Sequence, residues 1–98
     1  MPYRVSLSPR ALKHIAEIEH YLVARFYPQS SRRFVDRLLN ACESLALAPF
    51  RGTARDDLRP GLRTVGFERK VTIYFTIVED RIIIVSIMYR GRSRTNLR

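Results

Sequence analysis

A break at Pro28, between two stretches of helical periodicity, constrains the fold more than any other feature of the sequence. The first stretch opens at Ser8-Pro9, where serine is a favourable helix cap and proline suits the first helical position. From there to about Phe26 the apolar residues recur three and four apart, and they form one stripe made of Leu12, Ile15, Ile18, Leu22 and Phe26. Pro28 removes a backbone donor and disfavours helix at Tyr27, so the first helix should end there.

A second helical stretch follows the break, from about Ser30 to about Ala48, and Pro49 ends it. Its apolar stripe consists of Phe34, Val35, Leu38, Cys42, Leu45 and Ala46. Two amphipathic helices joined by so short a connection predict an antiparallel helical hairpin.

The remaining segments have the pattern of strands and turns. Residues 3–7 alternate apolar and polar side chains, which predicts a short N-terminal strand. Residues 49–60 contain proline, glycine and aspartate without an apolar period, which predicts a loop. Further strands are predicted at Leu62–Val65, Val71–Val78 and Arg81–Tyr89, with turns at Gly66–Arg69 and Glu79–Asp80.

This order of elements, β-α-α-β-β-β, predicts an α+β fold. The helical hairpin should pack on one face of a small antiparallel sheet, and the N-terminal strand should join the sheet at its edge. The nearly continuous apolar run in residues 81–89 suggests a strand covered on both faces. A chain of 98 residues fits one domain, so we expect residues 1–98 to form a single unit.

Several classes of protein are disfavoured by the sequence. No run of eighteen apolar residues is present, so we expect no membrane span, and the N-terminus lacks the apolar core of a secretory signal. A cytoplasmic location is therefore expected. Cys42 is the only cysteine, which excludes an internal disulfide and a multi-cysteine zinc site, and its place in the apolar stripe predicts a core residue.

Positive charge is the strongest compositional signal. The formal net charge is +9, and all basic residues except Lys13 and Lys70 are arginine. Residues 1–50 carry a net charge of +3 and residues 51–98 a net charge of +6, so the excess lies in the strand-rich half. The planar guanidinium suits phosphate and carboxylate alike. The charge therefore fits nucleic acid, an acidic protein segment, or a soluble surface rich in arginine.

Common catalytic arrangements are missing from the sequence. His14 and His20 are six apart on the first helix, which places them on different faces and predicts two surface histidines. No glycine-rich phosphate loop is present. Asp56 and Asp57 adjoin in a loop, where Asp57 is expected to cap the turn or to pair with a nearby arginine.

Arginines near the last strand are the remaining candidates for chemistry. Tyr89 ends that strand and is followed by Arg90, Arg92 and Arg94. Arg63 and Arg69 lie in the preceding strand and turn, from which they are expected to approach the same sheet face. Such a group can grip a phosphodiester and stabilise charge during its cleavage, or it can contact an acidic protein. Tyr89 can equally be a half-buried strand residue.

Several segments match a known pattern in this order and at these separations: Tyr3–Ala11, Arg33–Leu38, Arg51–Arg63, Val71–Phe75 and Ile87–Arg92. On these segments the chain resembles the RelE/ParE superfamily of toxins from bacterial toxin–antitoxin operons, over nearly its whole length. The run Asp57-Leu58-Arg59-Pro60-Gly61-Leu62-Arg63 is typical of the ParE branch.

The resemblance implies a growth-inhibiting toxin that a ParD-like antitoxin from the same operon neutralises. It also implies that a flexible antitoxin segment folds over the toxin, and that operator DNA is bound only through the antitoxin. No cofactor, metal or membrane partner is expected. The candidate antitoxin contacts are Leu12, Ile15, Leu22, Phe34, Leu38 and Arg63.

The two branches of the superfamily differ in their target. The ParE-like branch implies action on DNA gyrase without a hydrolytic site, and the target contacts would be Tyr89, Arg90, Arg92 and Arg94. The RelE-like branch implies ribosome-dependent cleavage of messenger RNA, and the catalytic candidates would be Tyr89, Arg69, Arg63 and Arg81. Tyr89 favours the cutting branch, whereas the lack of a lysine-rich middle strand and of a late histidine favours the ParE-like interpretation. A binding module or an inactive toxin is a third alternative.

Overall fold

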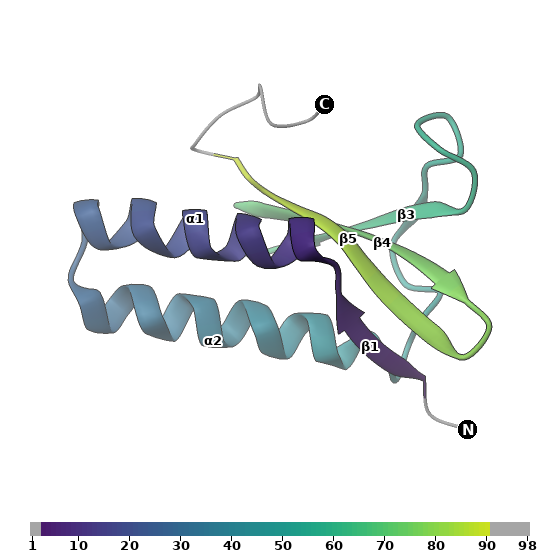
Figure 1. The fold of residues 1–98 in the computed structure, drawn as a ribbon, viewed down its shortest axis with the longest axis horizontal. Coiled ribbons are helices and arrows are strands. Elements are labelled where there is room, and N and C mark those ends of the chain that lie inside the picture. The colour runs from purple at the N-terminus through teal and green to yellow at the C-terminus, as the bar shows by residue number, and fades with distance from the viewer. Residues whose placement is uncertain (1–2, 91–98) are drawn as a thin grey trace.

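The computed structural model describes residues 3–90, and its elements follow the predicted order with one addition (Figure 1). The elements are β1 (Arg4–Leu7), α1 (Pro9–Arg25), α2 (Pro28–Ser44), β2 (Thr53–Ala54), β3 (Leu62–Phe67), β4 (Val71–Val78) and β5 (Arg81–Tyr89). The short strand β2 lies within the segment predicted to be a loop. α2 begins at Pro28 and ends at Ser44, earlier at both ends than the sequence pattern suggested.

The five strands form one sheet in the order β1-β5-β4-β3-β2. β2 to β5 pair antiparallel, but β1 pairs parallel to β5, with Val5 opposite Ile82 and Leu7 opposite Ile84. The predicted α+β fold is confirmed and β1 joins at the edge as expected, but the sheet is mixed and not wholly antiparallel. A parallel pair needs a long crossover connection. Here the helical hairpin and the β2–β4 segment together bring β5 back beside β1 in the same direction.

The helical hairpin is set by its two ends and its break. Ser8 caps α1, since its hydroxyl accepts a hydrogen bond from the Ala11 N–H at 3.0 Å. At the break, Phe26 is extended and Tyr27 forms the N-cap of α2 without a side-chain hydrogen bond. Pro28 then occupies the first turn of α2, a position that suits proline, so the second helix begins two residues before the predicted Ser30.

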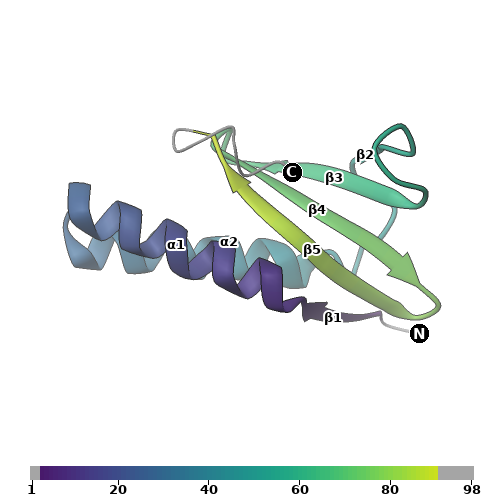
Figure 2. The ribbon, with the colours of Figure 1, turned by 45° about the horizontal axis from the view of Figure 1, so that its top comes forward.

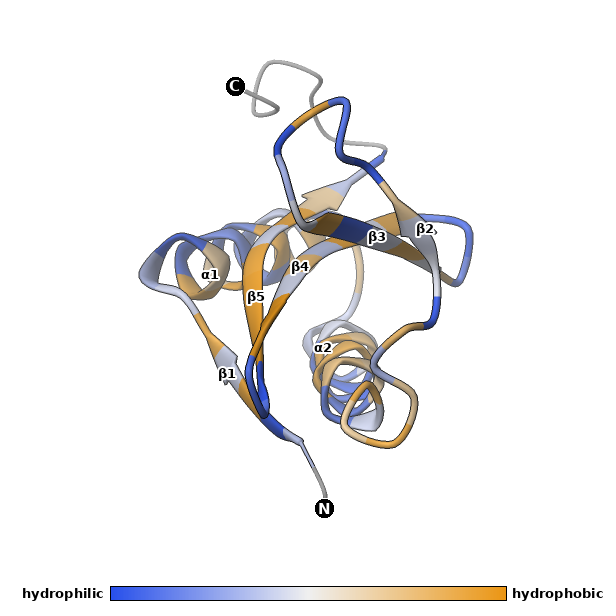
Figure 3. Cartoon of the chain, turned by 90° about the vertical axis from the view of Figure 1, so that its right-hand side faces the viewer, coloured by the Kyte–Doolittle hydropathy of each residue, from blue (hydrophilic) through white to orange (hydrophobic). Residues whose placement is uncertain are grey.

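The hydrophobic core lies between the hairpin and one face of the sheet. Leu38 of α2, Phe75 of β4, and Ile82 and Ile84 of β5 are fully buried there. In Figure 3, which looks along the hairpin, β4 and β5 cross above the space between the two helices and β5 is strongly apolar. Cys42 is fully buried in this core, which confirms its predicted place, and burial raises the pKa of its thiol to about 11.

Helices cover only one face of the sheet (Figure 2). On β5, Ile82, Ile84 and Ile87 face the core, whereas Ile83 and Val85 are only half-buried. The prediction that this strand is covered on both faces is therefore wrong. Its apolar residues on the second face contribute instead to an open surface. Within residues 3–90, no helix is long and apolar enough to cross a membrane.

Candidate partner-binding face

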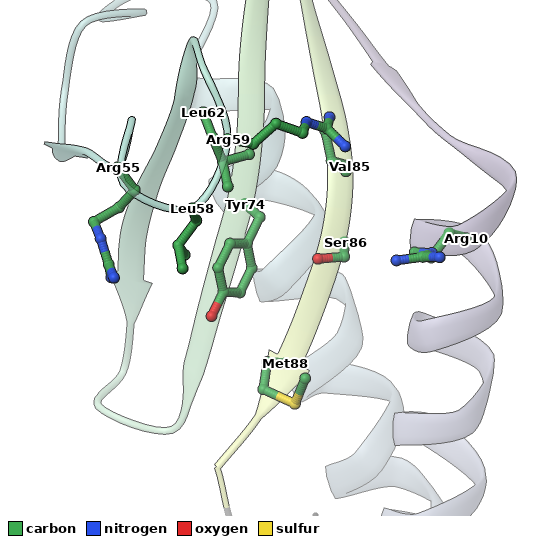
Figure 4. A pocket seen from close by; sticks show the side chains of 9 residues that line it. All are labelled: Arg10, Arg55, Leu58, Arg59, Leu62, Tyr74, Val85, Ser86 and Met88. Carbon is green, nitrogen blue, oxygen red and sulfur yellow. The ribbon is translucent and has the colours of Figure 1, made fainter. Parts of the chain in front are cut away.

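The open face of the sheet carries a basic cavity of about 430 Å³ (Figure 4). Strands β4 and β5 form its floor, the loop after β2 covers one side, and the start of α1 forms the other side. We call this region the basic cavity, and its lining residues are Arg10, Arg55, Leu58, Arg59, Leu62, Tyr74, Val85, Ser86 and Met88.

A β-bulge in β5 shapes the floor of the basic cavity. Tyr74 pairs with Ser86 and Phe75 pairs with Ile84, so Val85 is an extra residue on the bulged strand. Because of this extra residue, both Val85 and Ser86 line the cavity.

The residue before α1, Ser8, is hydrogen-bonded to β5 at this bulge. The Ser8 hydroxyl donates to the Val85 carbonyl oxygen at 2.9 Å, and the Ser8 N–H donates to the Ile84 carbonyl oxygen at 3.0 Å. Arg10 follows in the first turn of α1, and in Figure 4 its side chain points toward Ser86.

One histidine supports the same junction. His14 is half-buried, and its Nδ1 accepts a hydrogen bond from the Ile87 N–H at 3.1 Å. The prediction of two surface histidines is therefore wrong for His14, whereas His20 is exposed. Within residues 3–90, no group of three or more histidine, cysteine or carboxylate side chains is arranged to hold a metal ion.

The loop of residues 55–61 is held in place by its two aspartates. Arg55 donates twice to the Asp57 carboxylate, at 2.9 Å in each case, and the Gly61 N–H donates to Asp56 Oδ1 at 2.8 Å. This confirms the predicted pairing of Asp57 with an arginine. The hydrogen bonds from Arg55 lower the pKa of the Asp57 carboxyl group, so this carboxylate stays ionised at neutral pH.

The loop places Arg59 over the floor of the basic cavity. In Figure 4 its side chain reaches across toward Val85 on β5. The charged lining residues are Arg10, Arg55 and Arg59, and among residues 3–90 only Arg55 of these three forms an ion pair. Two guanidinium groups thus remain available beside Tyr74 and Ser86. This arrangement suits a carboxylate or a phosphate.

The predicted site residues do not form one cluster. Tyr89 pairs with Val71 on the core side of the sheet, and its ring packs against Tyr21 and Phe34 at centroid distances of 5.7 and 6.1 Å. Burial, with a smaller contribution from Tyr21, raises the pKa of the Tyr89 hydroxyl. Arg90 lies beside Arg69, since its guanidinium donates to the Arg69 carbonyl oxygen at 3.0 Å. Tyr89, Arg69 and Arg90 therefore share one end of the sheet.

Arg63 and Arg81 lie elsewhere. Arg81 begins the nine-residue strand that Tyr89 ends, so the two are about 26 Å apart. Arg63 pairs with Phe75 on the core side and donates to the Phe50 carbonyl oxygen at 2.6 Å, while its Nε is buried without a hydrogen-bond partner. Arg63 and Arg69 were expected to approach the same sheet face, but Arg63 lies near the start of β3 and Arg69 lies in the turn after its end. Arg92 and Arg94 lie outside the described residues.

Most candidate antitoxin contacts lie inside the core. Ile15, Leu22, Phe34 and Leu38 are buried between the hairpin and the sheet, so most of their surface is already covered by the chain itself. Leu12 is 56% exposed and Arg63 is half-buried. Of the predicted set, Leu12 is therefore the residue most accessible to a partner.

The residues that do converge were not indicated as site residues by the sequence pattern, namely Arg10, Arg55, Arg59, Tyr74 and Ser86. One signal was available for Tyr74. It alternates with Ile73 and Phe75, so a two-residue period places it on the uncovered face. No comparable local signal brings Arg10 and Arg59 together, because they come from different elements.

Taken together, the geometry defines a small α+β domain with a helical hairpin on one face of its sheet and a basic cavity on the other. The sequence model of the family described as the ParE toxin of the type II toxin-antitoxin system, parDE, matches residues 5–94, so the chain belongs to this family. This confirms the resemblance to the RelE/ParE superfamily and its ParE branch. No curated protein sequence shows significant similarity to the chain.

Two solved structures share the fold. The chromosomal ParDE TA system from P. aeruginosa superposes with a TM-score of 0.78 at 20% identity, covering 89% of this chain and 95% of that one. The toxin-antitoxin complex RelBE2 from Mycobacterium tuberculosis superposes with a TM-score of 0.68 at 16% identity, covering 92% of this chain and 100% of that one. At these identities the likeness concerns the fold.

Proposed function

We propose that this chain is the toxin of a type II toxin–antitoxin pair, that it arrests growth by acting on DNA gyrase in the cytoplasm, and that a ParD-like antitoxin neutralises it. The observation that carries the proposal is the family match over residues 5–94. Two of the solved structures that share the fold are a ParDE system and a toxin–antitoxin complex, which supports an antitoxin partner here as well.

The basic cavity is the proposed docking place of the antitoxin. Arg10 and Arg59 have no carboxylate partner within residues 3–90, and Leu58 beside them is 54% exposed. An acidic segment with apolar residues would satisfy both features, and it would gain order as it binds. Operator DNA would then be contacted through the antitoxin.

The chemistry of the basic cavity supports binding without hydrolysis. Its lining consists of arginine, tyrosine, serine and apolar residues. Cleavage of a nucleic acid by general acid–base catalysis needs instead a base with a pKa near the working pH. Tyr89 is held among aromatic rings and its pKa is raised, which makes it a poor base. These observations favour gyrase as the target.

One observation keeps cleavage of messenger RNA as a second candidate function. Tyr89, Arg69 and Arg90 meet at one end of the sheet, beside Lys70, whose carbonyl oxygen accepts the Arg90 N–H at 2.6 Å. Basic groups around a tyrosine can bind a phosphodiester and stack on a base.

Inducible expression, with and without the neighbouring operon gene, tests the proposal. We expect growth arrest from the chain alone, rescue by the neighbouring gene, early loss of DNA synthesis and inhibition of purified gyrase in a supercoiling assay. Intact gyrase activity together with new 5′ ends in translated messages would favour the ribonuclease instead. Normal growth with abundant soluble chain would contradict both.

A further inference from the structure

The turn of the helical hairpin exposes a group of large apolar side chains. Val23 is 42% exposed, Phe26 58% and Tyr27 81%. The cause is visible in Figures 1 and 2, where the hairpin extends past the end of the sheet. The apolar stripe of α1 is buried as far as Leu22, whereas the next apolar residue of the stripe, the C-cap residue Phe26, is exposed. Large apolar groups gathered on a surface mark an interaction site more often than single ones.

A small cavity of about 180 Å³ opens beside these side chains. Its lining residues are Leu22, Phe26, Ser30, Ser31, Phe34, Arg37, Lys70 and Tyr89. We call this cavity together with Val23 and Tyr27 the hairpin-tip patch. Leu22, Phe34 and Tyr89 contribute apolar surface to the cavity, and the lining also includes serine hydroxyl groups and two cationic side chains. This combination suits one large apolar side chain with a polar neighbour.

The charges around the hairpin-tip patch are mostly positive. Residues 19–37, which form the tip, carry four arginines and two carboxylates. At the cavity, Arg37 is engaged by Glu68 through hydrogen bonds of 2.7 and 3.0 Å. Lys70 forms no ion pair within residues 3–90. The patch therefore complements a partner that carries carboxylates next to its apolar side chain.

We propose that the hairpin-tip patch is the surface that contacts the cellular target, through an acidic protein segment that inserts one apolar side chain into the tip cavity. This inference rests on the proposed toxin function and assigns a second surface to it. A second copy of this chain is disfavoured as the occupant, because each copy brings the same positive charge. The antitoxin is placed at the basic cavity, on the opposite face of the sheet.

Separate surfaces are compatible with neutralisation. The molecule measures only 39 × 29 × 23 Å, so a protein that crosses the open face and is larger than this chain would extend beside the hairpin tip. A large target such as gyrase would collide with it.

Exposed aromatic side chains near arginine are also typical of the few residues that carry most of the binding energy in an interface.

Single substitutions at the hairpin-tip patch test the proposal. Tyr27→Ser removes the most exposed aromatic ring and leaves a good helix cap, so folding should be preserved. Lys70→Gln removes a cation that forms no ion pair within residues 3–90. Leu47→Ser is the matched control, because Leu47 is 86% exposed and follows the far end of α2. Each purified variant is measured for inhibition of DNA gyrase, for growth arrest on induction, and for its Kd toward the product of the neighbouring gene.

We expect Tyr27→Ser and Lys70→Gln to weaken gyrase inhibition and growth arrest about tenfold, with antitoxin affinity unchanged and Leu47→Ser like wild type. Wild-type toxicity retained in both tip variants would overturn the inference and leave the proposed function intact. Loss of antitoxin affinity at the tip would assign the patch to the antitoxin and also overturn it. A wild-type chain without toxicity would instead contradict the proposed function.

Discussion

At the scale of single residues, His14 shows how one side chain joins a helix to a strand. β1 pairs with β5 only as far as Leu7 and Ile84, so the later backbone groups of β5 have no strand on that side. Ile87 is 2% exposed, and its N–H is satisfied by His14 Nδ1 rather than by a neighbouring strand. To accept this hydrogen bond, Nδ1 must carry no proton. The side chain thus replaces part of a missing β-ladder.

Replacing His14 with leucine should measure this contribution. His14→Leu keeps an apolar side chain at the junction but leaves the Ile87 N–H without its acceptor, so we expect the free energy of unfolding to fall by about 1–3 kcal/mol. Urea denaturation followed by circular dichroism provides the measurement. His20→Leu, on an exposed position of the same helix, should stay within about 0.5 kcal/mol of wild type. Equal stability of the two variants would show that the hydrogen bond contributes nothing.

At the scale of elements, the turn between β3 and β4 is held by its neighbours. Glu68 and Arg69 both have positive φ values, 50° and 60°, in a turn where glycine and asparagine are usually preferred. Two contacts hold the strained turn. Arg37 of α2 donates two hydrogen bonds to the Glu68 carboxylate, and Arg90 donates one to the Arg69 carbonyl oxygen. The hairpin, the turn and the end of β5 are therefore one connected unit.

Because of this connection, the free energy of unfolding should depend on pH in the acidic range. The hydrogen bonds from Arg37 lower the pKa of the Glu68 carboxyl group below its usual value of 4.5. A lowered pKa in the folded state stabilises the fold above the usual value, and this stabilisation is lost as the pH falls through the folded pKa. We therefore expect Glu68→Gln to be less stable than wild type near neutral pH and to lose less stability between about pH 6 and about pH 3. Thermal unfolding across this range measures both effects.

Glu79→Gln provides the matched control for this pH dependence. Glu79 also has a positive φ, in the turn between β4 and β5, but it forms no ion pair in the described part of the chain. The loss of stability of Glu79→Gln between about pH 6 and about pH 3 should match that of wild type. Parallel curves for wild type and Glu68→Gln would show that the ion pair is screened by solvent and does not couple to folding.

Local patterns explain why the helices and the three long strands were predictable. The helical stripe, Pro28 and the alternation in β4 each depend on neighbouring residues. By contrast, the parallel pairing of β1 and the bulge at Val85 depend on segments that are distant in sequence. The basic cavity is predictable only in part for the same reason. The arginine excess was evident, but the convergence of α1, the loop and β5 requires the bulge and the Ser8 hydrogen bonds.

At the scale of the whole molecule, two surfaces of different chemistry lie on opposite sides of the sheet. The basic cavity offers the guanidinium groups of Arg10 and Arg59, which form no ion pair within residues 3–90, and the hairpin-tip patch offers aromatic rings. The two proposals assign the inhibitor to the basic cavity and the target to the hairpin-tip patch. The helical hairpin provides the second surface, because it extends past the end of the sheet.

The electrostatic share of antitoxin binding can be tested at Arg59. Its side chain reaches over the floor of the basic cavity and has no ion pair among residues 3–90. We expect Arg59→Ala to weaken binding of the neighbouring gene product about tenfold, ~1.4 kcal/mol, at low ionic strength. The difference from wild type should shrink at about 0.5 M salt, where charges are screened over a few ångströms. Arg32→Ala is the control, since Arg32 lies on α2 and pairs with Glu19 at 3.4 Å. If both variants bind with the affinity of wild type across this salt range, the antitoxin does not use the charge of the cavity.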